Sequence, residues 1–241
     1  MKALEKFPRP PVHVSGIWAH GHSLHLTMST PDIPKDSNSH IESLARMLDV
    51  ALGKRSVLPL NLHLQLDNSA RENKNQKLFR WAMVLVQRNI FRTATVGFLR
   101  KGHTHEDIDG LFGQLSLTIA HSQFDSLQEL EELLMRRLKT LGCDKPSQEA
   151  SLSYITDEVA DWEGFCDVLA VTFNKHGGPN APHVFRFFKR ADLAMEVSDA
   201  EAVDDFGANV PKRADDVFML CRHYMSSRDI CQVTAALPAN K

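Results

Sequence analysis

The chain has 241 residues, of which 43% are hydrophobic and 24% are charged, and this balance excludes a disordered tail, a collagen-like repeat and a coiled-coil rod. Its 28 lysines and arginines nearly balance its 30 aspartates and glutamates, which leaves a net charge of −2 with neutral histidines. No overall positive field therefore points to nucleic acid, and contact with DNA or RNA would need a local basic patch. A chain of this length is expected to form one or two domains.

The first half of the sequence alternates strand and helix patterns. Gly16 and Gly21 interrupt a β-prone stretch, and Ser39 and Glu42 have the spacing of a capping box. Leucines at every second position from 60 to 66 indicate a strand with one buried face. The predicted elements are a hairpin over 12–28, a helix over about 40–53, a strand over 60–66, an amphipathic helix over about 72–89, a strand over 93–99 and a helix that begins near 104.

This alternation predicts an α/β fold, because a helical crossover joins strands in parallel. A charged helix over 126–141 and a break after it place a domain boundary between residues 141 and 142. The predicted organisation is a main domain over 1–141 and a small α+β extension over 142–241. Strand-like pieces of the extension lie near 170–173, 183–189 and 217–224.

The sequence also favours an intracellular protein, cytoplasmic or nuclear, without a membrane span. Its longest apolar run, over 81–86, is far shorter than the ~20 residues needed to cross a bilayer. Its first residues lack an apolar signal core. The four cysteines have no Cys-x-x-Cys spacing, which favours buried thiols in a reducing compartment over a zinc knuckle or a disulfide framework.

A polar cluster follows the strand over 60–66, at the position where open α/β sheets bind ligands. It provides acidic, amide and basic side chains, and its basic residues continue into the next helix. The alternative is that Asp67 or Asn68 only caps that helix. The candidate residues are Asp67, Asn68, Arg71, Asn73, Lys74, Lys77 and Arg80.

A second polar cluster lies at the junction between the strand over 93–99 and the next helix. A structural explanation again competes with a functional one for these residues. Thr104 could be the N-cap of the helix, and acids in the first turn would stabilise the helix start. Asp109 lies one turn further in and is less well explained that way. The candidate residues are His103, Thr104, Glu106, Asp107 and Asp109.

The two clusters together predict a metal site. Forty-one residues separate Asp67 from Asp109 and hold one helix and one strand. Carboxylates from neighbouring strand ends can bind Mg²⁺ or Mn²⁺, as in two-metal phosphoryl-transfer sites. The same order of segments occurs between the second and third acids of ribonuclease-H-like nucleases and of transposases with an Asp-Asp-Asp or Asp-Asp-Glu triad.

Several short motifs in order resemble a large, functionally uncharacterised eukaryotic domain family found in transposon-like proteins. The resemblance covers residues 7–125 best. It implies a ribonuclease-H-like fold of mobile-element origin, with Asp67 as the second acid, Asp109 as the third and His103 as a metal or phosphate neighbour. Glu106 and Asp107 are alternates. The matching motifs are Asp67-Asn68, Asn73-Lys74-Asn75, Gly102-His103-Thr104 and Asp109.

The sequence departs from that pattern at its beginning, because no aspartate-bearing strand precedes the hairpin over 12–28. The first strand and the first acid are therefore expected to be missing. The hairpin would then pair with the strand over 60–66 or leave an empty slot in one mixed sheet, and phosphoryl transfer would be crippled. A non-catalytic module that binds nucleic acid, DNA in the first place, or a protein is the alternative, as is a truncated fragment.

Two further patterns are weaker evidence for a functional site. His20 and His22 share a face of the predicted hairpin, as a metal pair would, although ordinary strand histidines are favoured. Trp162 and Phe165 are interpreted as core anchors in preference to a platform for stacked bases.

Overall fold

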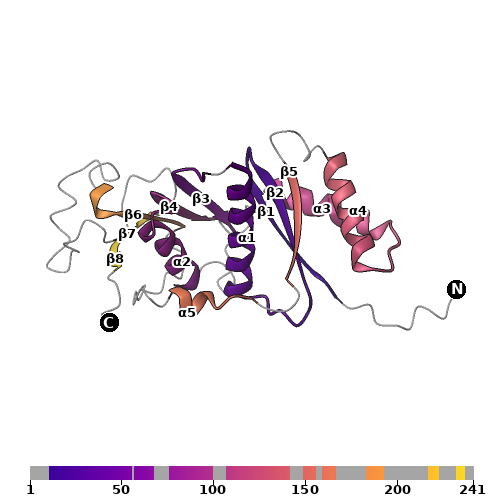
Figure 1. Ribbon diagram of the computed structural model, residues 1–241, viewed down its shortest axis with the longest axis horizontal. Helices are drawn as coiled ribbons and strands as arrows, with labels where there is room; N and C mark the ends of the chain where they lie inside the picture. The colour runs from indigo at the N-terminus through magenta and orange to yellow at the C-terminus, as the bar shows by residue number, and fades with distance from the viewer. Residues whose placement is uncertain are drawn as a thin grey trace. The chain divides into compact units, whose positions relative to one another are not determined.

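The computed structural model describes residues 11–55, 57–67, 76–99, 107–141, 149–155, 159–166, 183–192, 217–222 and 232–236 (Figure 1). Its helices are α1 (Ser37–Arg55), α2 (Gln76–Gln87), α3 (Asp107–Ala120), α4 (Leu127–Thr140) and α5 (Trp162–Cys166). Its strands are β1 (His13–Ala19), β2 (Ser23–Ser29), β3 (Asn61–Leu66), β4 (Thr93–Phe98), β5 (Glu149–Ile155), β6 (Val184–Lys189), β7 (Val217–Arg222) and β8 (Gln232–Ala236).

The chain forms two compact units, each assembled from separate stretches of sequence. The first unit comprises Met1–Lys35, Glu42–Lys54 and His105–Ala160. The second unit comprises Asp36–Ile41, Arg55–Thr104 and Asp161–Lys241. Among the described residues, no helix combines the length and the apolar composition that a membrane crossing requires.

The first unit contains a three-stranded sheet with the order β1-β2-β5. β1 and β2 form the predicted antiparallel hairpin, and Gly21 in its turn has a φ of +73°, which costs glycine little. β5 adds to β2 in parallel. The hairpin prediction is confirmed. Of the two alternatives for its edge, pairing with the strand over 60–66 or an empty slot, the described residues show neither, because β5 occupies that side of β2.

One face of this sheet is apolar and packs against α3 and α4. Alternate residues of β2 point to this face, as a period-two strand requires. The core comprises Leu24, Leu26, Met28, Leu111, Leu115, Leu130, Leu134 and Leu138, all buried. Ser126 caps α4 by accepting a hydrogen bond from the backbone N–H of Glu129, so the predicted helix start at residue 126 is confirmed.

The other residues of β2 form a buried polar row on the opposite side of the strand. His25 is 1% exposed, and its ring nitrogens lie 2.8 Å from Ser151 Oγ and 3.0 Å from Ser153 Oγ. Both serines belong to β5. Because a shift by one residue would turn His25 away from them, these hydrogen bonds select the register between β2 and β5.

Helix α1 begins earlier than the capping box at Ser39 predicts. Asp36 Oδ1 accepts a hydrogen bond from the backbone N–H of Ser39, and Ser39 Oγ accepts one from the N–H of Asp36. Asp36 is therefore the N-cap and Ser39 closes the box, while Glu42 is paired with Arg46 at 2.7 Å. The predicted helix is confirmed, but its cap is three residues earlier.

The second unit contains a five-stranded sheet with the order β3-β4-β6-β7-β8. β3 and β4 are parallel and are joined through α2, as the sequence predicts. β6, β7 and β8 continue the sheet in antiparallel fashion. The leucines of β3 are buried and its polar residues are exposed, which confirms the period-two prediction.

Helix α2 covers one face of this sheet. Phe79 lies 4.4 Å from Phe185 and 6.0 Å from Phe187 between ring centroids, and 6.1 Å from Phe98. Every residue from 81 to 86 is also buried. α2 is thus the predicted amphipathic helix packed on a sheet, and its buried face is wider than the predicted arc, since Trp81 and Val84 are buried as well.

The fold class is confirmed as mixed α/β, but the expected single sheet is replaced by two. The strand pairing does not confirm a ribonuclease-H-like order. Strands from beyond residue 142 complete both sheets: β5 joins the hairpin, and β6, β7 and β8 join the β3–β4 pair. The boundary between 141 and 142 stays a prediction. The strand predicted near 170–173 lies outside the described residues.

Candidate functional site

The β3–α2–β4 segment positions the first candidate acid. Asp67 follows the last residue of β3 directly and is exposed. The backbone N–H of Leu99 donates to the carbonyl of Leu66 at 3.3 Å, so the two parallel strands stay paired up to this edge. Carboxyl ends of parallel strands are the usual ligand side of α/β sheets. Asp67 therefore lies where a ligand can reach it.

The first turn of α3 carries the other acids. Asp107 and Asp109 both lie in this turn and both are exposed. Carboxylates at this position are stabilised by the helix dipole, so their presence alone does not require a metal. Leu111, directly after this turn, is buried and anchors the helix on the three-stranded sheet of the first unit.

The two acids belong to different units: Asp67 to the second and Asp109 to the first. Their convergence on one metal ion therefore stays a prediction. Other candidates lie outside the described residues, namely Asn68, Arg71, Asn73, Lys74, His103, Thr104 and Glu106. Within the described ranges, no three histidine, cysteine, aspartate or glutamate side chains gather in a way that could hold a metal ion.

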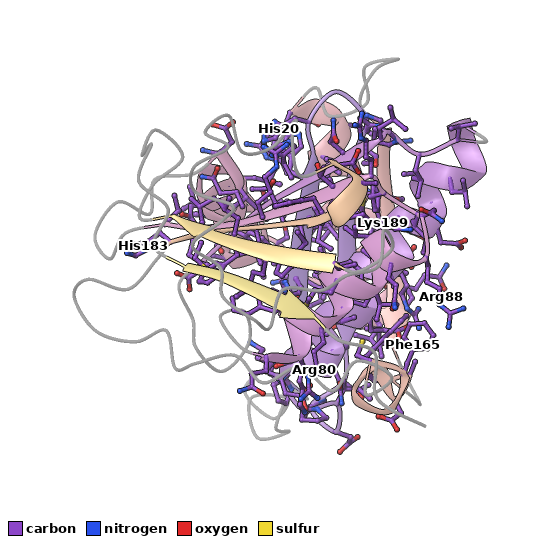
Figure 2. All side chains as sticks on the ribbon, turned by 90° about the vertical axis from the view of Figure 1, so that its left-hand side faces the viewer. His20, Arg80, Arg88, Phe165, His183 and Lys189 are labelled. Atoms are coloured by element: carbon purple, nitrogen blue, oxygen red, sulfur yellow. The ribbon has the colours of Figure 1, made fainter. Side chains whose placement is uncertain are left out.

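The cationic residues of α2 differ in accessibility. Lys77 and Arg80 are half-buried, whereas Arg88, just after the helix, is exposed (Figure 2). The first turn of α2 contains no acidic residue. Lys77 therefore adds its charge to the positive end of the helix dipole, near the strand edge that carries Asp67.

Two weaker predictions are corrected. His20 lies in the turn between β1 and β2, exposed and stacked on Trp18 at 5.4 Å, so it does not share a strand face with His22. Phe165 is 49% exposed, so it is not the core anchor that the sequence predicts. Cys166 and Cys221 are buried free thiols, as predicted.

The buried His25 was not singled out as a special histidine from the sequence. The available signal was its place between Ser23 and Thr27 at alternate positions of one strand, a polar row that is unusual for a buried face. Its serine partners come from a segment for which no strand was predicted. The pairing was therefore inaccessible to local patterns.

Comparison with known proteins provides a family but no described relative. No curated protein and no solved structure matches the chain. A family model described as a domain of unknown function (DUF7869) matches residues 2–202. This match covers most of both units, and the chain therefore belongs to the DUF7869 family.

Proposed function

We propose that this domain binds a divalent metal ion at nucleic-acid phosphates through Asp67 and Asp109, in the manner of ribonuclease-H-like nucleases and transposases. The observation that carries the proposal is the β3–α2–β4 segment, in which Asp67 directly follows the first of two parallel strands. After β4 the chain continues into α3, which has Asp109 in its first turn. The motif resemblance to a family found in transposon-like proteins supports the same assignment.

Two carboxylates suit this chemistry. Mg²⁺ keeps several waters and is usually bound by one or two carboxylates together with substrate phosphates. When bound, such an ion would supply Lewis-acid activation of a phosphoryl oxygen. Asp67 and Asp109 would provide negative oxygen ligands, and the phosphates would complete the coordination. Binding of the ion is therefore expected to depend on nucleic acid.

Turnover is expected to be slow or absent. The two acids of this proposal match the second and third positions of an Asp-Asp-Asp or Asp-Asp-Glu triad, and two carboxylates by themselves hold the two ions of a shared site poorly. We accordingly propose a domain that retains metal-dependent binding and that derives from a phosphoryl-transfer enzyme.

Metal binding tests the assignment. Mn²⁺ binding, measured by electron paramagnetic resonance with and without a short DNA duplex, should be at least tenfold tighter with DNA. Asp67→Asn and Asp109→Asn should each remove this gain, because each takes away an anionic ligand. Asp125→Asn is the matched control, since Asp125 is an exposed aspartate of the same unit as Asp109 and belongs to neither cluster. Rapid cleavage of labelled DNA by the unmodified chain would contradict the expected loss of turnover.

A non-catalytic nucleic-acid-binding module is the second candidate, and the cationic start of α2 favours it. Lys77 and Arg80 follow one another by nearly one helical turn on a helix without acidic residues in its first turn. Arg71 and Lys74, predicted for the same surface, lie outside the described residues. This function requires no metal ion.

Salt dependence distinguishes the two candidates. If Lys77 and Arg80 contact phosphates, Lys77→Gln and Arg80→Gln should each reduce the slope of log affinity against log salt concentration by about 1. Fluorescence anisotropy with labelled DNA in EDTA measures this slope. Asp109→Asn should leave it unchanged. Equal slopes for the unmodified chain and both variants would eliminate the module.

A further inference from the structure

We propose that the face of the five-stranded sheet opposite α2 binds a phosphate-type oxyanion through Thr95, His63 and Arg186. These residues form one row across three adjacent strands: Thr95 of β4 pairs with His63 of β3 on one side and with Arg186 of β6 on the other. The site goes beyond the proposed function, because it uses neither Asp67 nor Asp109 and needs no metal ion.

The faces of the sheet are assigned by the contacts of α2. Phe79 of α2 lies against Phe185 and Phe187, so these two side chains of β6 point to the helix. Arg186 lies between them in sequence and therefore points to the opposite face. In Figure 2, β6 runs between the labelled His183 and Lys189. Arg186 is the third of the six residues of this strand.

The row is narrow enough for its side chains to converge. Adjacent strands lie about 4.8 Å apart, so the backbones of His63 and Arg186 flank Thr95 at about 5 Å on either side. The imidazole and the guanidinium are long enough to reach over the short threonine side chain. His63 is exposed and Arg186 is half-buried, so the row is accessible from the β3 side.

The hydroxyl of Thr95 is an unusual feature of this face. Thr95 is 3% exposed, and its Oγ1 is buried without a hydrogen-bond partner among the described residues. Thr93, two positions earlier on the same face, donates to Asn61 Oδ1 at 2.9 Å. A buried hydroxyl without a partner costs free energy. A bound oxygen atom over Thr95 would remove that cost.

Gly97 leaves space beside Thr95. It lies two residues further along β4 on the same face, and a Cβ added there would meet, within the described part of the chain, only the carbonyl oxygen of Leu64 at 3.8 Å. Thus no side chain of β4 fills the position that follows Thr95 on this face. A small ligand would occupy this space.

The chemistry of the row selects the ligand class. β3, β4 and β6 contain no aspartate or glutamate. Arginine presents a planar fork of donors that matches phosphate and carboxylate oxygens, and Thr95 and His63 add donors from two further directions. Three separate donors suit the several oxygens of a phosphate better than the two of a carboxylate.

Phosphate-dependent thermal stability tests the site. The full chain is heated in EDTA with increasing inorganic phosphate, with sodium chloride and acetate at equal ionic strength as references. We expect a saturable rise in Tm with phosphate only. Arg186→Gln should weaken the apparent affinity at least tenfold. A Tm that shows no saturable phosphate response would overturn the proposal.

A pair of threonine variants separates binding from folding. Thr95→Val should abolish the phosphate response while keeping or raising the Tm without phosphate, because it removes a buried unpaired hydroxyl. Thr93→Val should lower that Tm, because Asn61 loses its donor, yet keep the response. A phosphate response of equal size in Thr95→Val and the unmodified chain would contradict the assignment.

Titration with a nucleotide distinguishes a free phosphate ion from the phosphate group of a nucleotide as the ligand. Adenosine monophosphate is titrated against the unmodified chain and Thr95→Val under the same conditions. Tighter binding than inorganic phosphate, lost in Thr95→Val, identifies a nucleotide ligand; equal binding identifies the free anion. A nucleotide response that survives Thr95→Val would count against the site. Because EDTA removes divalent ions, failure here leaves the metal proposal at Asp67 and Asp109 unaffected.

Discussion

Replacing Phe79 by alanine is expected to lower the free energy of unfolding by about 3–5 kcal/mol. Phe79 is 3% exposed and its ring contacts Phe98, Phe185 and Phe187. The substitution removes apolar burial, leaves a cavity and breaks aromatic contacts from β4 and β6 at once.

Denaturant unfolding followed by circular dichroism measures this loss. Phe165→Ala is the matched control, because the same atoms are removed from a side chain that is 49% exposed and contacts Trp162 edge to face. The control should lose about 1 kcal/mol, the size of one aromatic pair. Similar losses in the two variants would contradict the central role of Phe79 in the packing of α2.

Acidification between pH 6.5 and 4 is expected to destabilise the protein through His40. Burial lowers the pKa of His40 from 6.5 to about 4, and its Nε2 is buried without a hydrogen-bond partner among the described residues. In this range the unfolded chain takes up a proton that the folded chain does not. The contribution of neutral His40 to the free energy of unfolding is therefore complete above pH 6.5 and declines as the pH falls from 6.5 to 4. Below pH 4 this group causes no further loss.

The size of this effect is at most about 3.5 kcal/mol, since each unit of pKa difference corresponds to about 1.4 kcal/mol. Chemical denaturation at a series of pH values measures it. His40→Leu should flatten the profile between pH 6.5 and 4, and His20→Leu, at an exposed turn position, controls for the loss of a histidine as such. A profile of unchanged steepness in His40→Leu would assign the acid sensitivity to other groups.

Local patterns in the sequence predicted most of the helices, the first four strands, and the later strands β6 and β7. The leucines of β3 alternate with exposed Asn61, His63 and Gln65 as expected, because a strand with one buried face repeats every two residues. The glycine turn of the hairpin and the serine cap of α4 are equally local. Such features depend on residues that are neighbours in sequence.

The arrangement of the strands could not be predicted in the same way. The sequence left β2 either to pair with β3 or to border an empty slot, but β2 pairs with β5, whose Ser151 and Ser153 lie within hydrogen-bond distance of His25. The row proposed to bind an oxyanion also depends on pairing between distant segments, because Arg186 lies beside Thr95 only through the pairing of β6 with β4. Asp67 directly follows β3, as the sequence predicts, whereas its convergence with Asp109 stays a prediction.

The pairing of β2 with β5 has a consequence for synthesis on the ribosome. His25 and Ser151 lie 126 positions apart, and translation adds about 5–20 residues per second. The hairpin therefore waits about 6–25 s for its third strand. During that interval one edge of β2 and its row of leucines lack their final partners, which makes the nascent chain prone to aggregation and a natural client for chaperones.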